Sequence, residues 1–143
     1  MAKTTDLDAA FRATTYRVFV PGGPFSLRIG EAHAGLAAWL QEHGHTGFAI
    51  LSAWNPGAHA MPVTRNAERQ TALACDLLEG NFVLHAGENV PDEDAGWREE
   101  SCFVPDLAPE DACALGEAYG QSAVICGGTD GVPQLIWVSP QDA

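Results

Sequence analysis

Polar side chains that could bind or react with a small molecule occur in four short segments of the sequence. The segments are Ser52-Ala53-Trp54-Asn55-Pro56, Arg65-Asn66, Trp97-Arg98-Glu99-Glu100-Ser101 and Gly120-Gln121. The surrounding pattern predicts each segment at the end of a strand or at the start of a helix, where ligand sites of open sheets often form. A site built from them would bind its ligand through amide, carboxylate, hydroxyl and indole groups.

Trp54 and Asn55 follow a short apolar run that predicts a buried strand. An amide and an indole at this position can hydrogen-bond to a planar ligand and stack on it. The alternative is structural: Asn55 only fixes the turn that precedes Pro56.

Two further segments are placed at helix ends. Arg65 and Asn66 open a predicted helix, where a guanidinium and free backbone N–H groups can hold an anion. Gln121 begins a strand just after Gly120 ends a helix, so its amide can face the same site. For these residues the alternatives are ordinary helix capping and an amide that satisfies nearby backbone groups.

Glu99 is the candidate for acid/base chemistry. Side chains alternate along a strand, so Glu99 and Ser101 share one face and Glu100 points to the other, which rules out a paired-carboxylate site. Burial beside Trp97 would raise the pKa of Glu99 and suit it to act as a general acid or base. The alternative is an edge strand with solvated polar groups.

Apolar periodicity and turn residues predict the elements that position these segments. Helical spacing followed by a stop-signal glycine predicts helices over 32–43, 64–79 and 109–119. Short apolar runs predict strands over 15–20, 26–29, 48–52, 81–85, 99–104, 122–126 and 134–138. Residues 87–96 are expected to form an acidic loop.

This order of elements predicts a single α+β domain over residues 1–143, with residues 1–13 either flexible or forming a short helix. The sheet is expected to be mixed or mostly antiparallel, with about three helices covering one face. An α/β sandwich is the near alternative.

Charge and hydropathy exclude several functions. The chain has 143 residues and a net charge of −12, with 19 acidic residues against seven Lys and Arg. Such a surface repels nucleic acid and anionic membranes. No stretch has the roughly 18 apolar residues that a membrane span needs, and residues 1–10 do not resemble a secretion signal, so we expect a cytoplasmic protein.

Metal and cofactor motifs are not found in the sequence. The four cysteines form no Cys-x-x-Cys pair and are expected to be reduced core thiols. His43-Gly44-His45 lies at a predicted helix end, where basic side chains favour the helix dipole, so we expect no metal site. No phosphate-binding loop or Gly-x-Ser-x-Gly motif occurs, and the cofactor is left unassigned.

An ordered set of short motifs resembles an uncharacterised bacterial family, domain of unknown function 3293. The motifs are Tyr16-Arg17-Val18, Ala53-Trp54-Asn55-Pro56, Asn66, Trp97-x-Glu99-x-Ser101 and Gly120-Gln121. They extend over nearly the whole chain. The resemblance implies one compact bacterial domain and carries over no activity, cofactor or catalytic residue.

Two functions are compatible with these features. The leading hypothesis is a pocket for a small planar or anionic metabolite, with hydrolytic or acid/base activity if Glu99 reacts. Its residues would be Asn55, Asn66, Glu99, Ser101 and Gln121, with Arg65 nearby and Trp54 or Trp97 as a stacking wall. The alternative is a non-enzymatic, acidic interaction or regulatory module that binds a protein partner or a second copy. The pocket requires these distant residues to lie together.

Overall fold

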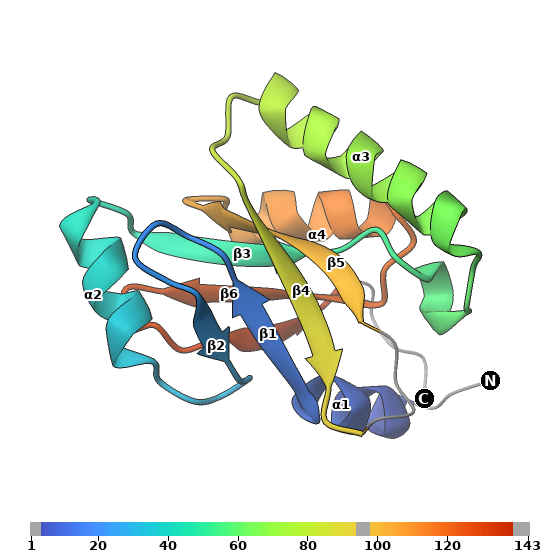
Figure 1. The fold of residues 1–143 in the computed structure, drawn as a ribbon, viewed down its shortest axis with the longest axis horizontal. Coiled ribbons are helices and arrows are strands. Elements are labelled where there is room, and N and C mark those ends of the chain that lie inside the picture. Colours follow the sequence, from blue (N-terminus) through green and yellow to red (C-terminus); the bar gives the residue numbers. More distant parts are fainter. Residues whose placement is uncertain (1–3, 94–97, 139–143) are drawn as a thin grey trace.

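A computed structural model describes residues 4–93 and 98–138 as one α+β domain (Figure 1). The helices are α1 (Thr4–Arg12), α2 (Ala34–Glu42), α3 (Val63–Glu79) and α4 (Pro109–Ala118), with a short 3-10 turn, η1 (Pro56–Ala58). The strands are β1 (Thr14–Val18), β2 (Phe25–Leu27), β3 (Gly47–Leu51), β4 (His85–Pro91), β5 (Glu99–Pro105), β6 (Ala123–Gly128) and β7 (Gln134–Trp137). Within the described part of residues 1–13, Thr4–Arg12 form the short helix α1.

The strands form one sheet in the order β2-β1-β4-β5-β3-β6-β7, and every neighbouring pair is antiparallel. The sheet is curled. Gly30, which follows β2, donates its N–H to the carbonyl of Pro133, just before β7, over 2.7 Å. The two outer strands of the sheet therefore come close together. Strand β5, which carries Glu99 and Ser101, lies in the middle of the sheet.

Helices cover both faces of the sheet, which corrects the expectation that they would cover one. The first core cluster joins α2 to one face and contains Tyr16, Val18, Val20, Leu27, Ile29, Leu36, Trp39, Leu40, Phe48, Ile50, Phe103 and Ile125. The second joins α3 and α4 to the other face and contains Ala49, Leu51, Ala53, Leu73, Leu77, Cys102, Val104, Leu107, Ala112, Val124 and Cys126. Successive residues of β3, β5 and β6 are apolar, so both faces must be covered.

The prediction for strand β4 was wrong. The apolar run over 81–85 is mostly connecting chain, in which Phe82 and Leu84 pack against the second core cluster. The strand runs instead through the polar residues His85–Pro91, because β1 and β5 pair with it on its two sides. Gly87 is required there, since a Cβ would lie 2.7 Å from both the Arg17 carbonyl oxygen and Ser101 Oγ.

The cysteines are free thiols, but not all of them lie in the core. Cys102 and Cys126 are buried and Cys113 is half-buried, whereas Cys75 is exposed on α3. Leu73 and Leu77, one helical turn apart, form the inner face of α3, and this places Cys75 on its outer face. The expectation of a buried Cys75 is therefore wrong.

Within the described residues, no helix combines the length and the apolar character that crossing a membrane would require.

Candidate functional site

Asn55 and Asn66 form a reciprocal pair of hydrogen bonds that joins the loop after β3 to the start of α3. The backbone N–H of Asn55 donates to Asn66 Oδ1 over 2.9 Å, and Asn66 Nδ2 donates to Asn55 Oδ1 over 2.9 Å. Asn66 is 1% exposed and does not cap α3, whose N-cap residue is Pro62. Asn55 has a left-handed backbone with φ of 47°, which asparagine tolerates better than most residues.

Glu99 is bonded to this asparagine pair. Asn55 Nδ2 donates to Glu99 Oε2 over 2.8 Å, and this contact connects the first residue of β5 to the loop after β3. Burial raises the pKa of Glu99, and the hydrogen bond from Asn55 opposes part of that rise. Glu99 is therefore a carboxyl group whose protonation is shifted toward neutral pH, as an acid/base residue requires.

Three strands place Tyr16, Asn89 and Glu99 side by side. Tyr16 of β1 lies opposite Asn89 of β4, and Asn89 lies opposite Glu99 of β5. Residues directly opposite in antiparallel strands point to the same face, and so do residues two apart, which adds Ser101. We call Tyr16, Asn89, Glu99 and Ser101 the polar row. It shares its face with Phe103 of the first core cluster, and Tyr16 donates its hydroxyl to the carbonyl of Phe11 in α1 over 2.8 Å.

Two side chains of the polar row carry buried polar atoms with no hydrogen-bond partner among the described residues. They are Asn89 Oδ1 and Ser101 Oγ, and Trp54 Nε1, next in sequence to Asn55, is a third. Ser101 is 4% exposed. Leaving a buried donor or acceptor unsatisfied costs about 1–3 kcal/mol. Buried polar atoms of this kind usually have a partner, so these three call for an explanation.

Side chains from α3 and from the end of α4 hold the loop that presents Asn55. Arg69 Nε donates to the Ala53 carbonyl over 3.0 Å, and its guanidinium also bonds the Tyr119 carbonyl. Gln70 accepts from the Ala53 N–H over 2.9 Å, and Gln121 Nε2 donates to the Trp54 carbonyl over 3.0 Å. Gln121 thus acts on the loop backbone, as its structural alternative proposed.

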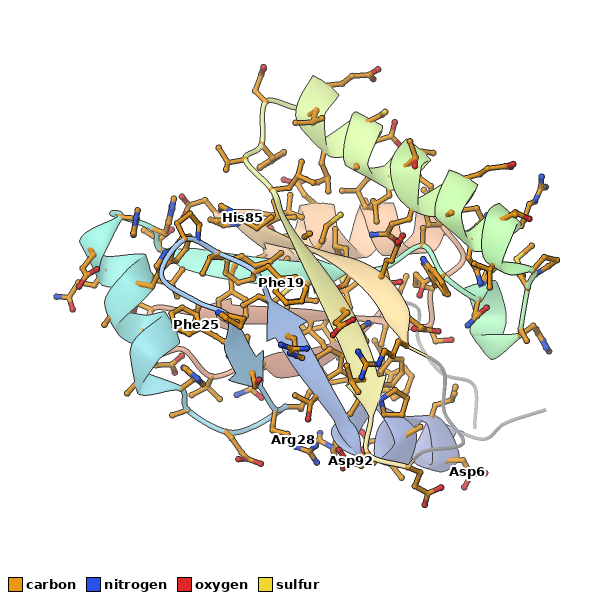
Figure 2. The ribbon with its side chains drawn as sticks, in the orientation of Figure 1. Asp6, Phe19, Phe25, Arg28, His85 and Asp92 are labelled. Atoms are coloured by element: carbon orange, nitrogen blue, oxygen red, sulfur yellow. The ribbon has the colours of Figure 1, made fainter. Side chains whose placement is uncertain are left out.

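Arg28 and Asp92 form an ion pair near the end of β4 (Figure 2), with Arg28 Nη1 2.6 Å from Asp92 Oδ1. Arg28 also donates to Thr15 Oγ1 and to the Arg12 carbonyl. This guanidinium is therefore already used in structural bonds beside the polar row.

The structure brings together some of the sequence-predicted residues and not others. Asn55, Asn66 and Glu99 are bonded directly, and Ser101 lies on the same face of β5 as Glu99. Arg65 is exposed on α3, with its Nη1 3.9 Å from Glu68 Oε2, and its expected contact with an anion stays a prediction. Trp97 lies outside the described residues. Across residues 4–93 and 98–138, no group of three His, Cys, Asp or Glu is placed to hold a metal ion.

Arg69, Gln70 and Asn89 were not identified from the sequence, and Tyr16 was named only within the motif Tyr16-Arg17-Val18 and not as a site residue. Asn66 and Gln70 precede Leu73 and Leu77 at the spacing of one helix face. That spacing was a usable signal that both polar residues are buried. Asn89 could not be found in this way, because its strand was predicted to be a loop.

Residues 51–124 of the chain match the family described as "Protein of unknown function (DUF3293)". The matched region includes Asn55, Asn66, Glu99, Ser101 and Gln121. Neither the search of curated proteins nor the search of solved structures gives a match.

Proposed function

Because the chain belongs to the DUF3293 family, whose function is unknown, we propose a function from the site itself. The chain binds a small, planar, uncharged molecule that presents N–H donors to the polar row. Glu99 exchanges a proton with the bound molecule if a reaction follows.

The observation that carries this proposal is the pair of unpartnered atoms beside Glu99. Asn89 Oδ1 is an acceptor, and a serine hydroxyl can donate or accept. Glu99 uses Oε2 for the bond from Asn55, and an ionised carboxylate keeps further acceptor sites on its oxygens. Acceptors therefore predominate on this face, and a ligand with N–H groups complements them.

The charges near the site favour an uncharged ligand over the anionic one also considered from the sequence. Arg28 is bonded to Asp92, Arg69 donates to backbone carbonyls, and Arg65 is exposed. An anion beside Glu99 would meet a like charge whenever that carboxyl group is ionised, which disfavours binding.

Planarity is inferred from Trp54. This half-buried side chain belongs to the loop after β3 and follows Ala53, whose backbone is bonded by Arg69 and Gln70. Its Nε1 has no partner among the described residues. An indole offers both a flat face for stacking and one N–H donor. A flat heterocycle with one acceptor and several donors therefore fits these groups.

A thermal-shift screen tests the proposal. The compounds are uncharged planar heterocycles with amide or amino N–H groups, together with planar carboxylates as the anionic comparison. A ligand at 100 times its Kd adds about 2.7 kcal/mol to the free energy of unfolding. We expect heterocycles to stabilise the wild-type chain and the Ser26→Ala control, whose altered serine is exposed on β2.

Glu99→Gln and Ser101→Ala should abolish or greatly reduce this stabilisation. Stabilisation by heterocycles that persists in both variants would show that they bind elsewhere. Stabilisation by carboxylates alone would contradict the proposed ligand chemistry.

A further inference from the structure

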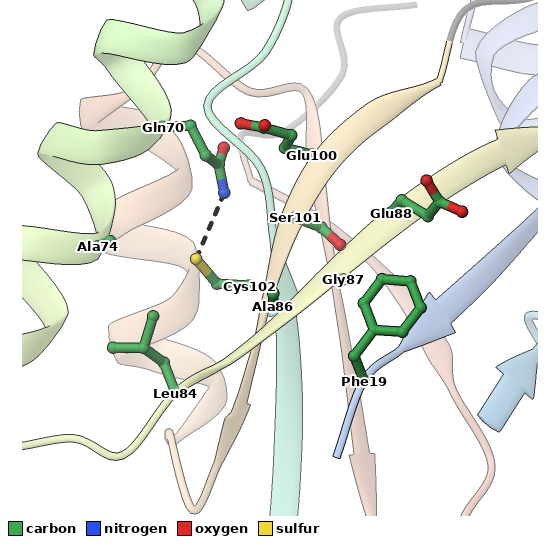
Figure 3. Close-up of a pocket in the computed structure, with 10 residues that line it drawn as sticks. All are labelled: Phe19, Gln70, Ala74, Leu84, Ala86, Gly87, Glu88, Glu100, Ser101 and Cys102. Atoms are coloured by element: carbon green, nitrogen blue, oxygen red, sulfur yellow. Dashed lines mark hydrogen bonds between the residues drawn. The ribbon is translucent and has the colours of Figure 1, made fainter. Parts of the chain in front are cut away.

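A groove of about 440 Å³ lies between α3 and the outer face of β4 and β5 (Figure 3). Its lining is largely apolar and includes Ala74, Leu84, Ala86 and Cys102, with Phe19 at one side. Cys102 and Ala86 are opposite each other in the sheet, and their side chains point to the face away from the Ser101 side chain. The groove therefore lies mainly on the opposite face of the sheet from the polar row, and Ser101 is the one residue that belongs to both.

Exposed apolar side chains occur in the lining of this groove and on the segments next to it. Phe19, Leu78 and Val83 are three of the four large apolar side chains that are exposed within the described part of the chain. Leu78 lies one helical turn beyond Ala74 on α3, and Val83 directly precedes Leu84. Scattered apolar residues are normal on a surface, whereas a group around one groove indicates an interaction site.

Carboxylates determine what the groove attracts. Glu88 is bonded to Arg17 over 2.8 Å and to Arg98 over 3.3 Å, so its charge is compensated. Glu100 also lines the groove and is exposed, and its side chain has no ion pair or hydrogen bond among the described residues. Because the chain carries a net charge of −12, the surface field also favours a positively charged partner.

We propose that this groove binds a short segment of a partner protein, in which a large apolar side chain stands next to Lys or Arg. The apolar side chain enters between Ala74, Leu84 and Phe19, and the cation pairs with Glu100. This inference does not depend on the ligand of the polar row.

Selection from a display library of random short peptides against the full chain tests this proposal. Enriched peptides are synthesised, and their affinities are measured by fluorescence anisotropy. We expect enriched sequences to place Phe, Leu, Ile or Met beside Lys or Arg. Leu78→Ser and Glu100→Gln should each weaken binding about tenfold, which corresponds to about 1.4 kcal/mol.

Val63→Ser is the matched control, because Val63 is 68% exposed on the same helix as Leu78, which is 60% exposed. Neither substitution removes a buried side chain, so both variants should fold. The proposal is overturned if no peptide is enriched, if acidic peptides are enriched, or if Val63→Ser weakens binding as much as Leu78→Ser. It is also overturned if sedimentation shows that the chain self-associates and that Leu78→Ser prevents this, since the occupant would then be a second copy.

Discussion

The side chain of Asn55 donates from Nδ2 to Glu99 Oε2 over 2.8 Å, although 44 residues separate the two in the sequence. Through Asn66, the same asparagine also joins this carboxyl group to α3. The contact orients a half-buried acid at the start of β5 and stabilises one rotamer of it. The stability of the fold and the proton affinity of Glu99 are therefore linked.

Glu99→Gln should make the fold more stable at neutral pH. The folded-state pKa of Glu99 is raised by burial, so below the ordinary carboxyl pKa both folded and unfolded chains hold the proton and no stability is lost. As pH rises, the unfolded chain ionises first, and wild-type stability falls by about 1.4 kcal/mol per unit of pKa difference. Glutamine removes this loss and can still accept from Asn55.

Chemical denaturation of both proteins from about pH 4 to about pH 8 measures the difference. The advantage of Glu99→Gln over the wild-type protein should grow with pH. A constant difference, or a variant that is less stable at high pH, would mean that the ionised carboxylate stabilises the fold and is structural.

Asn55→Ala should destabilise the fold more than Asn55→Gly does. Both changes remove the side-chain bonds to Glu99, Asn66 and the Met61 N–H. This should lower the free energy of unfolding by about 2–4 kcal/mol. Alanine also has to adopt φ of 47°, which costs about 1 kcal/mol more than for glycine. Equal unfolding free energies in urea would show that the loop relaxes to another backbone conformation.

The fold class could be predicted because most elements have simple periodic patterns. The spacing of Leu36, Trp39 and Leu40 gave α2, and the run at Phe48 gave β3. Strand β4 has no such pattern, since Gly87, Glu88 and Asn89 are stabilised as a strand by their neighbours β1 and β5. Pairing on both sides outweighs the low strand propensity of these residues.

The candidate site was predictable where side-chain alternation or a turn determined it, as for Glu99, Ser101 and Asn55. The asparagine pair depends on how α3 packs beside the loop after β3, which no local pattern specifies. Asn66 was therefore selected only because it is a polar residue at a predicted helix start. The structure shows that its side chain bonds to Asn55, a contact that the sequence did not predict.

His85 should make the protein less stable as pH falls below neutral. It lies 5.7 Å from the Trp39 ring, between centroids, and burial lowers its pKa, as do the nearby His45 and His43. Above the ordinary pKa of about 6.5 the imidazole is neutral in both states. Below it the unfolded chain takes up a proton that folded His85 resists, so unfolding is favoured.

His85→Leu removes this contribution. Between about pH 8 and about pH 5.5 the wild-type protein should lose more unfolding free energy than the variant. His45, which pairs with Asp106 over 2.7 Å, is retained in both proteins, so the difference measures His85 together with its repulsion of His45 and His43. Equal losses would show that His85 gains its proton as readily in the folded chain.

Thiol labelling should separate the cysteines. Cys75 is exposed and should react quickly in native buffer. Burial raises the pKa of Cys102 to about 11 and that of Cys126 to about 12, so both should react only on unfolding. Mass spectrometry of peptides after brief labelling gives the order, and early modification of Cys102 would show that the reagent reaches its thiol through the groove beside α3 in the folded chain.

Crystals soaked with a set of uncharged planar fragments provide the most direct test of the polar row as a binding site. We expect a fragment with an N–H group within hydrogen-bond distance of Asn89 Oδ1 or Glu99, and a second contact to Ser101 Oγ. The account is contradicted if fragments occupy only other surfaces, such as the groove beside α3, while Asn89 and Ser101 bond only to water.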